Sequence, residues 1–149
     1  MTSLLIALHI IAAVLLLGPV TVAVSTYQIQ MIKASQGDQR SVGAAETLHR
    51  ITNTYGFLSA IVPIIGIAIF LLNLDVFGTR GNFHASILLS VIAWGILIFL
   101  IIPRQKSTLR ALQAGSANRV DMVSEKKKLS MFGGIFCLLW LVTAILMFF

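Results

Sequence analysis

The sequence LSMFGGIFCLLWLVTAILMFF, residues 129–149, decides the fold class because it contains no charged residue. At about 1.5 Å per residue, an α-helix of this length crosses the roughly 30 Å hydrocarbon core of a bilayer. Toward the N-terminus, three further predominantly apolar stretches cover residues 4–25, 48–73 and 83–102. The chain is therefore predicted to be all-α, a transmembrane four-helix bundle that forms a single domain.

The overall composition supports this prediction. Of the 149 residues, 58% are hydrophobic and 11% are charged, whereas soluble domains average about 25% charged residues. The mean hydropathy is +0.95. Four spans with short connections use nearly every residue, so the sequence leaves no room for a soluble catalytic domain.

The positive charge is concentrated between the spans. Most of the eleven Lys and Arg residues lie in two loops, 26–47 and 103–128, whereas the 74–82 connection carries only Arg80, balanced by Asp75. Loops rich in Lys and Arg stay in the cytoplasm. Both basic loops are therefore predicted to be cytoplasmic and both chain ends external, in a bacterial plasma membrane. The charge is explained by topology and by contact with anionic lipids, and no nucleic-acid partner is expected.

Two histidines are candidate haem ligands. His9 is the deepest ionisable residue of the first span, and His84 begins the third span, which runs parallel to the first. Both are therefore predicted near the outer face, where neutral imidazoles can ligate haem b iron. One observation argues against a shared site. His84 projects away from the expected packed face of its helix, which the small residues Ser86, Ser90 and Ala93 form. In the alternative, His9 bonds a neighbouring carbonyl and His84 is an interfacial residue.

Four polar residues at the start of the second span form a second candidate site. Glu46, His49, Arg50 and Asn53 are spaced i, i+3, i+4 and i+7, so they share one helix face. If this face points into the bundle, it forms a polar cytoplasmic site. The alternative is a solvated helix end with an ordinary Glu46–Arg50 ion pair. No catalytic residue and no metal site other than haem are predicted.

Proline and small residues predict the shape of the bundle. Pro63 lies inside the second span, where it removes a backbone donor and predicts a bend. In the last span, Gly133 and Cys137 are small residues spaced four apart, and such stripes mark the faces on which membrane helices approach closely.

Short motifs carry a resemblance to known families. Residues 8–13 (LHIIAA), 18–19 (GP) and 48–52 (LHRIT) resemble a small, uncharacterised family of bacterial four-span membrane proteins, over most of the chain. More remotely, a histidine early in the first of four spans is similar to the copper-resistance D proteins and the membrane protoporphyrinogen oxidase HemJ. The oxidase resemblance implies haem at His9 alone. Residues 14–19 (VLLLGP) lack the tryptophan and glycine pair of those relatives, and no span holds a counterpart of the oxidase's functional lysine, so no reaction is implied.

Three functions remain open from the sequence. The first is a non-catalytic integral membrane subunit that packs into a larger complex, such as a respiratory one. The second is a haem-binding membrane redox protein that uses His9. The third is a small oligomeric transporter or lipid-interacting protein that uses the Pro63 bend and the polar face from Glu46 to Asn53. No span has an acidic residue at its middle, which argues against a proton-coupled transporter. The expected partners are the lipid bilayer and either other membrane subunits or further copies of the chain.

Overall fold

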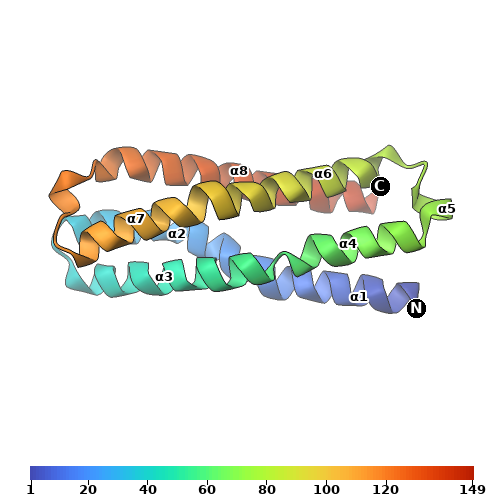
Figure 1. Ribbon diagram of the computed structural model, residues 1–149, viewed down its shortest axis with the longest axis horizontal. Helices are drawn as coiled ribbons and strands as arrows, with labels where there is room; N and C mark the ends of the chain where they lie inside the picture. The colour runs from blue at the N-terminus through green and yellow to red at the C-terminus, as the bar shows by residue number, and fades with distance from the viewer.

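The computed structural model describes residues 1–149 as helices with short connections and no strand. Four helices are long and apolar enough to cross a membrane: Thr2–Ser35, Gln39–Leu72, Gly81–Gln113 and Met122–Phe148. They alternate in direction, so both chain ends lie at one end of the bundle, which we call the terminal end (Figure 1). The other end is called the basic end, because every Lys and Arg except Arg80 lies in that half. The predicted all-α four-helix bundle is confirmed.

The long helices extend well beyond the apolar stretches that predict them. For the segments 26–47 and 103–128, interpreted as cytoplasmic loops, the sequence left open whether they are irregular or helical extensions. They are mostly helical and leave only short connections around residues 36–38 and 114–121. A helix of 34 residues is about 50 Å long, compared with roughly 30 Å for the hydrocarbon core. Hydropathy detects only the part that lies in lipid. The rest stays helical because it packs inside the bundle, as the buried Tyr27 and Leu109 show.

The first long helix changes geometry near its middle. It consists of α1 (Thr2–Ala12), a π-helical turn over Ala13–Leu17, and α2 (Gly18–Ser35). Pro19 lies in the first turn of α2 and has no N–H to donate to the turn before it. Such single π-turns absorb an irregularity without ending the helix.

The second long helix is interrupted one turn before Pro63, so the predicted bend is confirmed. α3 (Gln39–Leu58) and α4 (Ile61–Leu72) are separated by a turn at Ser59–Ala60. Pro63 cannot donate to the Ser59 carbonyl, and this carbonyl instead accepts the Val62 N–H at 3.0 Å. The freed backbone oxygen is thus satisfied within the helix, as an apolar environment requires.

The other two long helices differ in regularity. The third contains α6 (Gly81–Ile96), a π-helical turn over Leu97–Ile101, and α7 (Ile102–Gln113), with Pro103 in the first turn of α7. The last, α8, runs from Met122 to Phe148 without interruption. The remaining elements are two short helices in the connections, α5 (Leu74–Phe77) and a 3-10 turn at Ala117–Arg119.

Asp38 caps the helix that follows the first basic connection. Its carboxylate accepts the Arg40 N–H at 3.1 Å and the Ser41 hydroxyl at 2.9 Å. The Ser41 hydrogen bond holds the pKa of the Asp38 carboxyl below its ordinary value. Capping is therefore present at neutral pH and is lost as the pH falls through this lowered pKa. The chain reverses just before the cap at Gly37, whose φ of 101° favours glycine.

The bundle is tightly packed in its basic half and open in its terminal half. The buried core joins α2, α7 and the first half of α8, and its largest fully buried side chains include Tyr27, Met31, Leu97, Leu129 and Phe136. By contrast, α1 has no buried residue and lies chiefly against α4 (Figure 1). The predicted packed face of the third helix is confirmed, because Ser86, Ser90 and Ala93 are buried.

Gly133 lies at a close approach of α2 and α8. A Cβ atom placed there would lie 3.2 Å from the Val24 carbonyl oxygen, which belongs to the backbone of the facing helix and cannot rotate away. The neighbouring Gly134 faces open space, with no atom within 4 Å of such a Cβ. Matched substitutions at the two glycines therefore distinguish a loss of helix packing from the other effects of replacing glycine.

We predict that Gly133→Leu destabilises the bundle by about 1–3 kcal/mol through overpacking, whereas Gly134→Leu does not. The measurement is thermal unfolding of the two variants and the wild type in the same detergent. Equal stability of the two variants would show that α2 and α8 are not held together at this point.

Candidate functional site

A small cavity lies inside the terminal half of the bundle. Its volume is about 140 Å³, and all four long helices contribute to its lining. His9 and Ala13 come from the first helix, Pro63 and Gly66 from α4, Ser90 from α6 and Trp140 from α8. We call it the terminal cavity. It lies beside the proline-associated turns, where the packing changes from tight to open.

The position of His9 depends on a glycine of the facing helix. A Cβ atom at Gly66 would lie 3.2 Å from Cε1 of the imidazole, so the missing side chain is what lets the ring pack on α4. Pro63, three residues earlier, lines the same cavity. The bend and the glycine, both on α4, therefore hold the imidazole inside the terminal half.

Among the cavity residues, Trp140 has a buried Nε1 with no hydrogen-bond partner. His9 Nδ1 also lacks a hydrogen bond of good geometry, but the backbone of Val62 offers the His9 imidazole a hydrogen bond, as the alternative interpretation of this residue expected. The other two polar side chains in the lining are satisfied by their own helices. The Ser90 hydroxyl donates to the Ile87 carbonyl at 2.8 Å and the Thr143 hydroxyl to the Leu139 carbonyl at 2.8 Å. An indole N–H can only donate, and leaving it unpaired is costly in an apolar site. The cavity is therefore suited to a molecule that presents an acceptor atom.

The cavity is closed on one side and open on the other. α4 packs against both α1 and α6, and α6 packs along α8, whereas α1 and α8 make no extensive contact. Of the lining residues on α8, Ala144 and Met147 are exposed. The opening between α1 and α8 faces sideways, toward the lipid in a membrane-embedded bundle.

His84 does not join His9 in this cavity. Its ring packs edge-on against Phe70, with centroids 4.9 Å apart, and its Nδ1 lies 3.2 Å from the Arg80 carbonyl oxygen. It is exposed and does not contribute to the cavity lining. The cavity itself holds about one ring, much less than a porphyrin. The residues thus do not fit a haem enclosed between the two histidines.

The polar face of the second helix is divided between the surface and the interior. Glu46 and Arg50 form an ion pair at 3.3 Å with largely exposed side chains, and Asn53 is exposed. Only His49 turns inward, where its Nδ1 lies 3.1 Å from Oε1 of the buried Gln105. The four residues therefore do not form one polar pocket.

His49 belongs to a buried polar network that crosses the basic half. The Tyr27 hydroxyl donates to the Gln105 carbonyl at 2.8 Å and lies 2.8 Å from the Thr108 hydroxyl. The Tyr27 ring packs edge-on against His49, with centroids 6.5 Å apart. The network links α2, α3 and α7, and Tyr27 and Gln105 are fully buried. The network is only partly satisfied, because Gln105 Nε2 is buried without a partner. Its paired members still connect three helices, and such buried bonds help to fix the register of packed helices.

Comparisons with known proteins found no matching family model, no matching curated protein and no matching solved structure.

Sequence reasoning did not single out Trp140, Tyr27 or Gln105. The sequence does contain a signal for Trp140 as a site residue. Its indole N–H lies in the middle of an uncharged stretch and needs a hydrogen-bond partner that its neighbours do not supply. Tyr27 and Gln105 lie beyond the apolar stretches, in segments interpreted as cytoplasmic loops. Their burial depends on the helical extensions, which hydropathy does not detect.

We predict that Tyr27→Phe destabilises the protein by about 1–2 kcal/mol, because it leaves buried partners on α7 without their hydrogen bond. Tyr55→Phe is the matched control, since Tyr55 is exposed, at 36%. Thermal unfolding in detergent measures both effects. A loss of stability no greater for Tyr27→Phe than for Tyr55→Phe would contradict the role of the network.

Proposed function

We propose that this chain is a non-catalytic membrane protein that binds a lipophilic molecule in the terminal cavity, entered sideways from the bilayer. The observation that carries the proposal is the buried, unpartnered Nε1 of Trp140 in an otherwise mostly apolar lining. Binding sites are typically apolar with a few polar groups that orient the ligand. The proposal shares lipid binding and the Pro63 bend with the third function that the sequence left open, but it places the site in the terminal cavity and not at the polar face from Glu46 to Asn53.

The size of the cavity limits what enters it. Its volume of about 140 Å³ is close to the roughly 150 Å³ of an engineered cavity that binds benzene in another protein. It therefore accommodates one ring or a short chain segment, with the rest of the molecule in the lateral opening. The bound group carries an oxygen acceptor such as a carbonyl, because the indole can only donate.

The orientation of the bundle places this site relative to the membrane. With the basic end in the cytoplasm of a bacterium, as the distribution of Lys and Arg favours, the terminal cavity opens to the outer leaflet. The ligand would then be a molecule that partitions into that leaflet.

We predict that Trp140→Phe, which keeps an aromatic ring but removes the N–H, lowers retention of the bound molecule about tenfold, as expected for one hydrogen bond of about 1.4 kcal/mol. The measurement is mass spectrometry of the lipophilic molecules that co-purify with the tagged chain from its native membrane. Trp94→Phe is the control, because the Trp94 indole already donates to the Gly56 carbonyl at 3.1 Å and lies outside the cavity lining. Identical co-purifying molecules in all three proteins would refute the proposal.

A second candidate function is supported by α1. This helix has no buried residue and exposes Leu4, Leu8 and Ile11 along its length. A helix that packs chiefly against one neighbour can dock onto another membrane protein through its free face. The chain would then be an accessory subunit of a larger complex, such as a respiratory complex, or would associate with further copies of itself.

We expect a photo-crosslinking residue at Leu8, on the free face of α1, to join the chain to a second membrane protein in native membranes. The matched position is Leu138, which is exposed on α8. Gel analysis followed by mass spectrometry identifies the products. Crosslinks to lipid alone from both positions would remove the support for an accessory subunit.

A further inference from the structure

A second cavity lies near the basic end, where α7 meets α8. Its volume is about 310 Å³, within the range of small-molecule sites. Phe99 and Leu100 line its apolar side, and Arg104, Ser107 and Glu125 line its polar side. We call it the basic cavity. It shares no lining residue with the terminal cavity.

The charges at the basic cavity do not cancel. Arg104 Nη1 lies 3.4 Å from both carboxylate oxygens of Glu125, and Lys128 Nζ lies 3.7 Å from Oε1 of the same carboxylate. Two cations therefore share one anion. Arg104 Nε is buried without a partner, and a guanidinium has five N–H donors suited to phosphate oxygens. The cluster keeps a net positive charge and unused donors.

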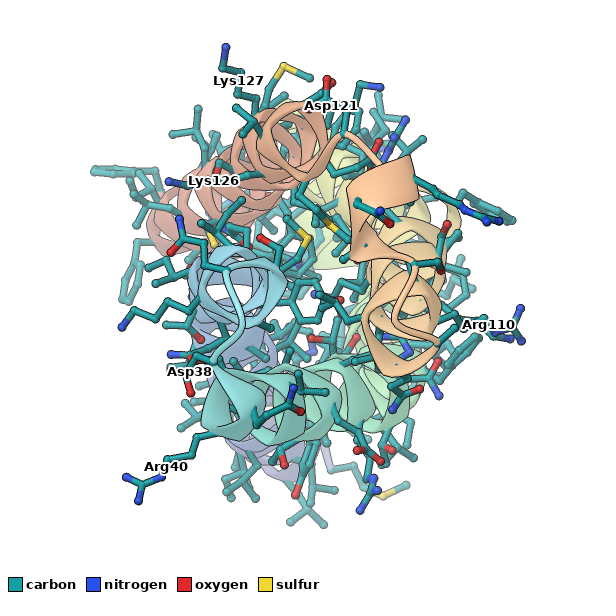
Figure 2. The ribbon with its side chains drawn as sticks, turned by 90° about the vertical axis from the view of Figure 1, so that its left-hand side faces the viewer. Asp38, Arg40, Arg110, Asp121, Lys126 and Lys127 are labelled. Carbon is teal, nitrogen blue, oxygen red and sulfur yellow. The ribbon has the colours of Figure 1, made fainter.

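Arg104 is fixed in place by its surroundings. Its Cζ lies 5.4 Å from the centroid of the Phe132 ring, a cation–π arrangement. Only about a third of its side chain is exposed, 31%. By contrast, Arg110, Lys126 and Lys127 point outward from the bundle (Figure 2). Arg104 is therefore held at a cavity, whereas Arg110, Lys126 and Lys127 are exposed to solvent.

The cavity lies at the level where the helices leave the membrane core. Arg104 directly follows the apolar stretch that ends at residue 102 and Pro103, and Lys128 directly precedes the apolar stretch that begins at Leu129. Phe99, one turn toward the membrane, is among the most exposed large apolar residues, at 73%. Positive charge thus lies beside exposed apolar surface, which matches an anionic lipid at the interface.

We propose that the basic cavity binds an anionic phosphate group carried by a membrane lipid. The Arg104 guanidinium donates to the phosphate oxygens, and the acyl chains lie along Phe99 and Leu100. Lys128 lies outside the lining, beside Glu125, and adds positive charge next to the site. Glu125 orients Arg104 and limits the net charge of the site. The site is separate from the terminal cavity, so either proposal can fail without the other.

The test is native mass spectrometry of the purified full chain in detergent, titrated with phosphatidylglycerol and, separately, with phosphatidylcholine. We expect the wild type to prefer phosphatidylglycerol and Arg104→Gln to lose about tenfold or more in affinity for it, as for a hydrogen bond to a charged group. Arg110→Gln removes the same charge from the exposed face of the same helix and should keep the preference. An equal loss of affinity in both variants would show that only the net charge of the protein matters, and it would overturn the proposal.

Glu125→Gln is a second variant, for which an increase in affinity is expected. It tests the proposal even if Arg104→Gln fails to fold. Removing the carboxylate frees both cations, so affinity for phosphatidylglycerol should rise, whereas unchanged or weaker binding would contradict the site. Inorganic phosphate is the remaining probe. If it displaced phosphatidylglycerol at equal concentration, the cavity would be a site for free phosphate and the assignment to a lipid would be overturned.

Discussion

The structure depends on one constraint, that backbone polar groups inside a membrane must be satisfied by the protein itself. Each of the three prolines of the chain removes one donor, Pro19 and Pro63 within apolar stretches and Pro103 at the end of one. Near Pro19 and Pro103 the helix responds with a π-helical turn, and before Pro63 with a tighter turn that pairs the Ser59 carbonyl with Val62. All three adjustments occur near the middle of their long helices. They divide the bundle into two halves.

The two halves have different properties. In the basic half, α2, α7 and α8 share a packed core with a network of buried hydrogen bonds that includes Tyr27 and Gln105. In the terminal half, α1 follows α4 and makes no extensive contact with α8, which leaves the cavity with the unpaired Trp140 indole. A rigid half thus supports an open half. The proposed entry of a ligand from the bilayer would use the open half and leave the packed core intact.

The sequence predicts the number of helices and the bend near Pro63, because apolar length and a missing N–H act locally. It also predicts the packed face of Ser86, Ser90 and Ala93. It does not predict where the helices end, since the extensions are stabilised by burial of residues such as Tyr27 and Leu109. Helical spacing alone also does not predict which of the polar residues from Glu46 to Asn53 are exposed and which turn inward, because this depends on the neighbouring helix. His49 turns inward only because Gln105 lies opposite on α7.

The proposed function requires that lipid can reach Trp140 in the terminal cavity between α1 and α8. Fluorescence quenching by lipids brominated on their acyl chains tests it directly, with Trp94→Phe as the background in which Trp140 is the one remaining tryptophan. We predict quenching in this background, a strong reduction when Ala13→Phe fills the cavity, and no reduction with Val14→Phe on the exposed face. Absence of quenching would show that lipid does not reach Trp140. An equal reduction by both substitutions would show that lipid does not reach it through the terminal cavity.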